Sequence, residues 1–247
     1  MIQAAVTEAV PLFGCQGIEL TLGGRLILND VALEAHAGQI LGIIGPNGAG
    51  KTSLFEVLSG RIHQQRGQVF LEGRDISRLS IQDRVRAGIG RTYQSPVVPE
   101  GLPVSDVLKA ARKAFHPILT EHQAEWAADL VRLDVPGSTL AGSLDTLQRR
   151  KLLLACLLMR RPKVLLLDEP ASGLISAELE ELDQILRVLV HEMRMALLVV
   201  EHRLELLAAV ADEVMVLDLG RRIASGAPEE VFSHPDVRAA YFEVAEA

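Results

Sequence analysis

The chain has 247 residues, of which 49% are hydrophobic, and a formal net charge of −7 at pH 7. The hydrophobic content excludes a disordered chain, and the length allows one large domain or two small ones. The negative charge disfavours a general nucleic-acid binder, which usually carries a basic face. The longest apolar run, Leu152 to Met159, is far shorter than the ~20 residues of a membrane-spanning helix. We therefore expect no membrane span.

The N-terminus carries no basic residue before its apolar part, so we expect no secretory signal. The two cysteines, Cys15 and Cys156, are far apart and lack C-x-x-C spacing. Cys156 lies within an apolar run, where a buried thiol is the ordinary interpretation. The cysteine content favours the cytosol.

The first part of the chain is typical of antiparallel strands, at residues 17–22, 26–35 and, after one helix, 67–73. From about Gln94 to Arg161 strand-like runs disappear and a helical pattern replaces them. The helical stretches in this part are residues 104–115, 121–133 and 147–159.

Four short runs rich in Val, Ile and Leu suit parallel strands covered on both faces: residues 39–44, 164–167, 196–200 and 214–219. Helical patterns lie between them. In residues 176–193 the leucines at positions 179, 182, 186 and 189 form one apolar stripe. Strands that alternate with helices predict an α/β core, with an antiparallel β subdomain and an inserted helical subdomain.

Residues 45–52, GPNGAGKT, match the phosphate-binding pattern G-x-x-x-x-G-K-[ST] between an apolar strand and a helix that closes at Gly60. The glycines allow a tight turn whose N–H groups point at phosphate oxygens, and the helix N-terminus favours an anion. We expect Lys51 to reach the β- and γ-phosphates and Thr52 to place its hydroxyl on Mg²⁺. The alternative is a glycine-rich turn without a ligand.

Residues 164–170, VLLLDEP, place two acids at the end of an apolar strand. We expect Asp168 to hold the Mg²⁺ shell and Glu169 to orient and deprotonate the attacking water. Two exposed acids at a strand end are the alternative. The upstream phosphate-binding loop favours the catalytic interpretation.

With these motifs the chain resembles the ATP-binding subunits of ABC transporters over nearly its whole length. RTYQSP (91–96), LLVVEH (197–202) and the tail at 211–231 support the resemblance. It implies that Gln94 meets Mg²⁺, the attacking water and the membrane partner, and that His202 lies near the γ-phosphate. Without the resemblance, Gln94 would be interpreted as a surface glutamine and His202 as a structural histidine.

The resemblance implies one ABC ATPase domain over residues 1–247. Residues 1–94 and 162–247 would form the P-loop NTPase core with its β subdomain, and residues 95–161 the helical subdomain with the signature loop. ATP and Mg²⁺ are the implied ligands, with Thr52, Gln94 and Asp168 at the metal. The implied nucleotide-binding residues are Gly45, Pro46, Asn47, Gly48, Ala49, Gly50, Lys51, Thr52, Ser53 and Leu22.

The implied partners are a second ABC ATPase subunit and transmembrane permease subunits, at the cytoplasmic face of the inner or plasma membrane. The segment GIGRTYQSP, the closing segment GAPEEVFSHPDVRAAYF and the compact helical insert resemble the branched-chain amino acid and urea uptake group. That group uses two different ATPase subunits in each transporter.

The chain departs from the family at the signature loop, where L-S-G-G-Q is replaced by LDTLQ at residues 144–148. Asp145 would face the ATP of the other subunit. One such pair of like charges at 4 Å costs roughly 1 kcal/mol in water and about 4 at a surface-like dielectric, which weakens ATP-driven closure ~5-fold to ~1,000-fold. Leu147 is expected to add bulk where glycine is wanted. Asp145 also fits the N-cap of a helix with Gln148 in a capping box, and both roles can hold.

Two further departures concern single positions. Ile175 stands where the family usually has an Asp or Asn that contacts the opposing site. Leu22 stands near the position of the aromatic residue that stacks on adenine, and it offers apolar contact without stacking.

The chain keeps every residue that acts on its own nucleotide: Lys51, Thr52, Gln94, Asp168, Glu169 and His202. The residues that it would offer to the partner's nucleotide, 145–147 and Ile175, are altered. The leading hypothesis is therefore the ATP-hydrolysing subunit of a membrane importer, working in an asymmetric heterodimer. The alternative is a regulatory or structural subunit that binds nucleotide with negligible hydrolysis. A soluble ABC protein acting on nucleic acid or the ribosome fits the acidic charge poorly.

Overall fold

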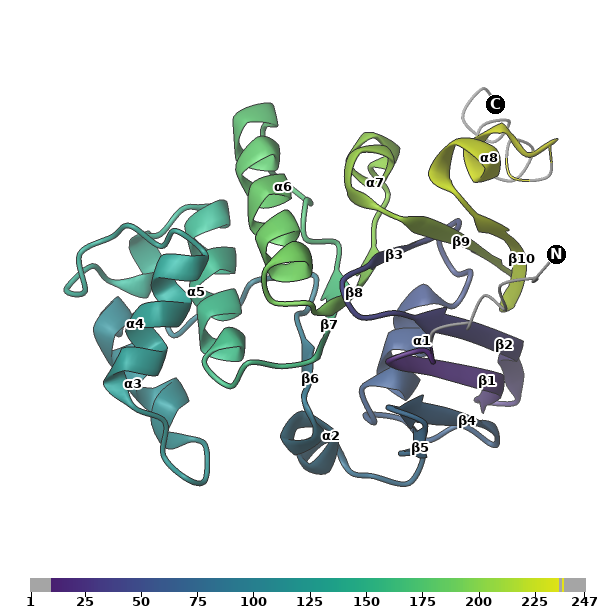
Figure 1. The fold of residues 1–247 in the computed structure, drawn as a ribbon, viewed down its shortest axis with the longest axis horizontal. Helices are drawn as coiled ribbons and strands as arrows, with labels where there is room; N and C mark the ends of the chain where they lie inside the picture. The colour runs from purple at the N-terminus through teal and green to yellow at the C-terminus, as the bar shows by residue number, and fades with distance from the viewer. Residues whose placement is uncertain (1–9, 236, 238–247) are drawn as a thin grey trace, which may run out of the picture.

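Two β-sheets frame the molecule in the computed structural model, which describes residues 10–235 and 237 (Figure 1). The smaller sheet is antiparallel, with strand order β2-β1-β4-β5. Its strands are β1 (Phe13–Leu22), β2 (Arg25–Ala35), β4 (Arg66–Leu71) and β5 (Arg74–Asp75). The predicted antiparallel segments are confirmed, and β5 is an addition that the sequence pattern did not indicate.

The larger sheet has the strand order β10-β9-β3-β8-β7-β6, and only its edge strand β10 runs antiparallel to its neighbour. Its strands are β3 (Ile40–Ile44), β6 (Ile89–Arg91), β7 (Val164–Asp168), β8 (Ala196–Val200), β9 (Glu213–Asp218) and β10 (Arg221–Gly226). The four apolar runs all form strands here, because they are buried on both faces. The three-residue strand β6 was not predicted.

Alternate residues of the large sheet belong to two different hydrophobic cores. In β7, Val164 and Leu166 pack with the small sheet and with α1 (Lys51–Leu58), whereas Leu165 and Leu167 pack with helices on the opposite face. Successive side chains of a strand point to opposite faces, which produces this division. Ala49 of the phosphate-binding loop and the buried apolar residues of α1 belong to the core on the side of the small sheet.

Three helices form the separate group at one end of Figure 1: α3 (Val104–Lys113), α4 (Glu121–Leu130) and α5 (Thr146–Leu158). They confirm the helical patterns predicted between Gln94 and Arg161. A small core that includes Val98, Val107 and Leu152 holds this group together. Helix α5 also contributes Leu154 and Leu158 to the large core.

The remaining helices are α2 (Ile81–Ala87), α6 (Ser176–His191), α7 (Leu204–Val210), α8 (Pro228–Ser233) and the short 3₁₀ helix η1 (Ala141–Ser143). Helix α6 buries its predicted stripe, apart from the half-buried Leu179. The tail forms the expected hairpin, β9 and β10, followed by α8. Within the described residues no helix is long and apolar enough to cross a membrane. Residues 1–9 and 238–247, which include part of the closing segment, lie outside the described residues.

Arg84 of α2 is fully buried and stabilises the C-terminus of α1. It donates hydrogen bonds to the carbonyl oxygens of Val57 and Leu58, both at 2.8 Å, and of Ser77 at 2.9 Å. Burial lowers the pKa of its guanidinium to about 10. The cation satisfies carbonyl groups that a helix end leaves open.

We expect Arg84→Ala to lower the free energy of unfolding by about 2–4 kcal/mol, because buried carbonyl groups lose their donors. Arg86→Ala is the matched control, since Arg86 lies on the same helix and pairs with the exposed Asp83. Its expected loss is below ~1 kcal/mol. Chemical denaturation of the two variants measures the difference, and equal losses would contradict the capping role.

Candidate functional site

The phosphate-binding loop adopts the tight turn that the motif requires. Gly50 is the N-cap of α1 with a φ of 105°, a left-handed conformation that favours glycine. A Cβ atom at Gly45 would lie 2.1 Å from the carbonyl oxygen of Leu217, so no larger residue fits there. The Lys51 ammonium donates to the carbonyl oxygens of Gly45 at 2.6 Å and Pro46 at 3.0 Å. Lys51 is thus fixed at the loop itself.

One cavity of about 530 Å³ opens in front of this loop, a volume suited to a small-molecule ligand. It brings together the loop and the three side chains expected to act in catalysis. Its lining consists of Arg25, Leu26, Ile27, Asn47, Gly48, Gly50, Lys51, Thr52, Ser53, Gln94, Glu169, His202 and Leu219. Of the predicted nucleotide-binding residues, Gly45, Pro46 and Ala49 support the loop from behind this lining, and Ala49 is buried.

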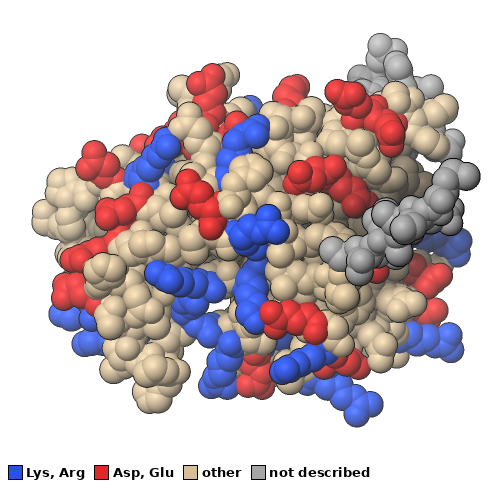
Figure 2. Space-filling view, in the orientation of Figure 1, with Lys and Arg blue, Asp and Glu red and all other residues tan. Residues whose placement is uncertain are grey.

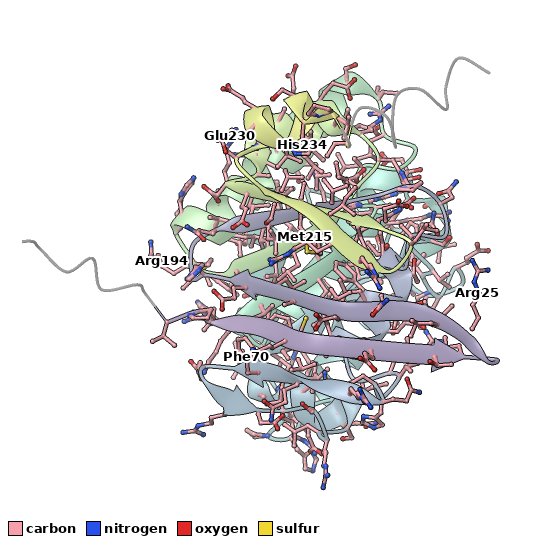
Figure 3. All side chains as sticks on the ribbon, turned by 90° about the vertical axis from the view of Figure 1, so that its right-hand side faces the viewer. Arg25, Phe70, Arg194, Met215, Glu230 and His234 are labelled. Atoms are coloured by element: carbon pink, nitrogen blue, oxygen red, sulfur yellow. The ribbon has the colours of Figure 1, made fainter. Side chains whose placement is uncertain are left out.

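The predicted contact from Leu22 is replaced in this cavity by the first residues of β2. Among the described residues, Leu22 does not line the cavity. A β-bulge lies in this part of β2: Leu20 pairs with Leu28 and Thr21 with Leu26, so Ile27 is an extra residue on β2. Bulges redirect side chains next to functional sites. Figure 3 shows Arg25 at the edge of the molecule, beside the turn that joins β1 and β2.

We expect Leu26→Ala to weaken nucleotide binding about 3- to 10-fold, because its half-exposed side chain lines the cavity and offers apolar surface to a bound nucleotide. Leu22→Ala, the matched control on the neighbouring strand, should change the Kd by less than about 2-fold. Isothermal titration with ATP measures both values. A larger loss of ATP affinity in the Leu22 variant than in the Leu26 variant would support the sequence-based prediction that Leu22 contacts the nucleotide.

The three predicted catalytic side chains form one connected group. The Glu169 carboxylate accepts a hydrogen bond from Nε2 of Gln94 at 2.7 Å and lies 3.1 Å from Nε2 of His202. Glu169 follows β7, His202 follows β8, and Gln94 follows β6, so all three stand at the carboxyl ends of neighbouring parallel strands. Ligands bind at this edge of open α/β sheets.

The backbone of Glu169 has an unusual conformation, with a φ of 47°. Residues other than glycine rarely adopt positive φ, and such strain gathers at functional sites. The amide of Glu169 donates to the carbonyl oxygen of Val200 at 2.9 Å, which ties the end of β7 to the end of β8.

Asp168 is buried at the end of β7, next to Arg91 of β6, whose Nη2 lies 3.5 Å from its carboxylate. Burial raises the pKa of Asp168, while the Arg91 guanidinium acts in the opposite direction. Burial likewise lowers the pKa of Lys51, opposed by the carboxylates of Glu169 and Asp168. Lys51 and Glu169 line the cavity, whereas Asp168 is buried outside its lining, and the three charges influence one another.

The donor set fits Mg²⁺. Asp168 supplies a carboxylate, Thr52 a hydroxyl and Gln94 an amide oxygen, since its amide nitrogen bonds to Glu169. Mg²⁺ prefers oxygen ligands and takes few from the protein, with waters and phosphate oxygens completing its shell. Within residues 10–235 and 237, no group of three or more His, Cys, Asp or Glu side chains is placed to hold a metal.

The altered signature loop lies at the start of α5. Asp145 is exposed and caps this helix: its carboxylate accepts from the amide of Gln148 at 2.7 Å, and the Gln148 side chain accepts from the amide of Asp145 at 3.2 Å. The predicted capping box is confirmed. Asp145 and Thr146 line a groove next to Gln94, and Ile175 is exposed at the start of α6.

The expectation that Leu147 adds bulk toward the partner is wrong. Leu147 is only 5% exposed and belongs to the large hydrophobic core. It is the second residue of α5, and the helix turns this position toward the sheet rather than toward the surface. Among the three altered signature residues, Asp145 and Thr146 remain as the exposed changes.

Three charged residues next to the site were not predicted: Arg91, Arg150 and Glu201. Arg91 and Glu201 each stand within three residues of a predicted catalytic side chain, at the end of a strand. Their place at a strand end could have indicated them from the sequence, because the same place indicated Asp168 and Glu169. Arg150 lies on α5, and its contacts reach a segment about 20 residues away along the chain, which no local pattern indicates.

Comparison with known proteins adds independent findings. The family model for the ABC transporter matches residues 28–172, and that for the branched-chain amino acid ATP-binding cassette transporter matches residues 221–242. The chain is 31% identical to the high-affinity branched-chain amino acid transport ATP-binding protein BraF of Pseudomonas aeruginosa, covering 94% of this chain and 97% of BraF. It is 33% identical to LivG of Salmonella typhimurium, of the same description, over 94% and 97%. A crystal structure of the ADP conformation of an ATP-binding cassette superposes with a TM-score of 0.86 at 25% identity, over 94% of this chain and 99% of that chain.

Proposed function

Because the chain belongs to the ATP-binding subunits of ABC transporters, we propose that it binds and hydrolyses Mg-ATP to drive an importer, peripherally at the cytoplasmic face of the membrane. The observation that carries this proposal is the connected group of Gln94, Glu169 and His202, which faces the phosphate-binding loop across one cavity. An intact loop alone would support binding. The acid with its two partners supports hydrolysis as well.

Each side chain of the site has its own role in the proposed hydrolysis of ATP. The loop amides and Lys51 bind the β- and γ-phosphates and offset their charge. Glu169 orients the attacking water and takes its proton, and Gln94 fixes the carboxylate from one side. Nε2 of His202 lies 3.1 Å from the Glu169 carboxylate, and in the proposed reaction His202 contacts the γ-phosphate. Mg²⁺, when bound, supplies charge neutralisation of the phosphates, with Thr52, Asp168 and Gln94 holding its shell.

The second subunit of the proposed pair is a different ABC ATPase. The surface that this chain offers to its partner's nucleotide carries Asp145 and Ile175, where a carboxylate repels phosphate and an isoleucine offers no hydrogen bond. Two copies of this chain would form two weak sites. A partner with an unaltered signature would complete this chain's site, so the working form is an asymmetric heterodimer.

The proposed contact with the permease is an apolar groove of about 420 Å³ beside Gln94. It is lined by Tyr93, Val97, Phe115 and Cys156 among others, from the segment after β6 and from the helical group. Tyr93 and Val97 are large exposed hydrophobic side chains, which mark interaction surfaces when they gather. A permease segment seated here would transmit nucleotide-driven motion through residues 94–103.

The same proposal includes the division of the chain into a nucleotide-binding core with its β subdomain, residues 1–94 and 162–247, and a helical subdomain, residues 95–161. For the solute, the names of BraF and LivG and the matched C-terminal model support branched-chain amino acids, with other amino acids or urea as the wider class. The solute itself is selected by the membrane and binding-protein partners.

The test is Mg²⁺-dependent ATP hydrolysis by this chain alone and mixed with the ABC ATPase subunit encoded next to it. We expect hydrolysis to appear in the mixture and to be weak for the single chain. Lys51→Ala, which removes the loop cation, should abolish nucleotide binding by this chain. If the mixture hydrolyses ATP at a rate that is independent of this chain's site, the regulatory or structural subunit that binds ATP without turning it over becomes the better description.

A further inference from the structure

The segment after Glu169 is held by a buried carboxylate that directly follows β8. Glu201 is 2% exposed and accepts a hydrogen bond from the amide of Ala171 at 2.6 Å on one oxygen. Its other oxygen accepts from the amides of His202 at 3.1 Å and Arg203 at 3.5 Å. One side chain is thus bonded both to the segment that carries Glu169 and to the segment that carries His202.

A cation from α5, the helix that starts in the altered signature loop, also holds this segment. Arg150 of α5 donates from Nη1 to the carbonyl oxygen of Glu169 at 2.7 Å and from Nη2 to that of Ser172. Burial lowers the pKa of Arg150, opposed first by the nearby Glu201 carboxylate. Its Nε is buried and has no hydrogen-bond partner among the described residues. The two carbonyl contacts offset part of the cost of burying this guanidinium.

These contacts are made at and directly after Glu169, whose backbone is strained. Glu169 has positive φ, and strain of this kind persists only where surrounding interactions fix the backbone. An anion on the amide of Ala171 and a cation on the carbonyl oxygens of Glu169 and Ser172 supply such interactions within four residues.

We propose that Glu201 and Arg150 are positioning residues for ATP hydrolysis, which together hold the segment 169–172 so that the Glu169 carboxylate stays between Gln94 and His202. This inference rests on the proposed function. In the structure both side chains bond to backbone atoms around Glu169 and His202, and neither is among the residues that line the nucleotide cavity. Their effect therefore falls on turnover and leaves nucleotide binding in place.

The first variant is Glu201→Gln, which keeps the shape but replaces one acceptor oxygen by an amide group that cannot accept. Arg150→Lys keeps the charge but cannot bridge two carbonyl groups with one planar fork. In the assembled subunit pair we expect each to lower kcat about 10- to 100-fold, with KM for ATP within about 3-fold. Because both act on one segment, the double variant should lose less than the product of the single losses.

Glu181→Gln is the matched control. Glu181 of α6 pairs at 2.6 Å with the buried Lys151, which adjoins Arg150 on α5. Its loss disturbs a partly buried ion pair of α5 but none of the contacts to residues 169–172. We expect its kcat to stay within about 2-fold. Amide hydrogen exchange in the single chain gives a second readout: exchange at residues 169–175 should rise in Glu201→Gln and not in Glu181→Gln.

The outcomes separate the two proposals. If the unmodified pair hydrolyses ATP and Glu201→Gln lowers kcat no more than Glu181→Gln at equal folded fraction, the positioning role is overturned and the proposed function stands. If the unmodified pair fails to hydrolyse ATP, the proposed function fails, and the positioning role fails with it because no reaction remains to be positioned. A loss of kcat together with faster exchange at residues 169–175 supports the role.

Discussion

Glu169→Gln is expected to lower Mg²⁺-dependent ATP hydrolysis by the subunit pair about 100- to 10,000-fold, the range typical of a lost general base. The amide has the same shape and can still bond to Gln94 and His202, which contact the carboxylate at 2.7 and 3.1 Å. It cannot take a proton from the attacking water. Phosphate release by the mixed subunits measures the loss, and ATP binding should stay within about 3-fold.

The control for this prediction is Glu180→Gln, which changes an exposed carboxylate on α6 and should leave the rate unchanged. An unaltered rate in the Glu169 variant would assign the chemistry to the partner's pocket. This chain would then bind ATP in a regulatory or structural role, which is the alternative hypothesis.

Asp145→Ser is expected to strengthen ATP-driven association with the partner ~5-fold to ~1,000-fold, because it removes a carboxylate from the surface offered to the partner's phosphates. The fold should be preserved, since serine is also a good N-cap and forms the same capping box with Gln148. The measurement is sedimentation of the two subunits with ATP, in forms that cannot hydrolyse it. Asp145→Ala, which loses the cap as well as the charge, should cost about 0.5–2 kcal/mol of stability.

Changing all of residues 145–147 to the family signature would mix the effect on association with an effect on stability. Leu147→Gly removes a buried side chain and places glycine in a helix, which should cost about 3–6 kcal/mol of stability. A triple change of residues 145–147 would therefore report unfolding as much as activity. Asp145→Ser with tight ATP-driven association and an unchanged unfolding midpoint would support the interface role of the charge, whereas unchanged association would contradict it.

Local patterns predicted most of the fold and the centre of the site. The buried strands were readable because they are continuous apolar runs, and the loop around Lys51 because its function fixes residue type and spacing. The structure differs from expectation where direction depends on packing: Leu147 faces inward because α5 lies against the sheet, and the cavity is lined by Arg25, Leu26 and Ile27 rather than by Leu22. Arg150 could not be found because its contacts reach a segment that is distant in sequence, whereas the only signal for Glu201 was its place directly after a strand.

The capping box of α5 has a consequence for how this chain can evolve. A single base change in the codon converts aspartate to asparagine, and asparagine caps a helix about as well as aspartate does. The helix uses the carboxylate at position 145 as a hydrogen-bond acceptor, and the negative charge adds only a small favourable interaction with the helix N-terminus. At the proposed interface with the partner, by contrast, this one mutation would be enough to change the strength of ATP-driven closure.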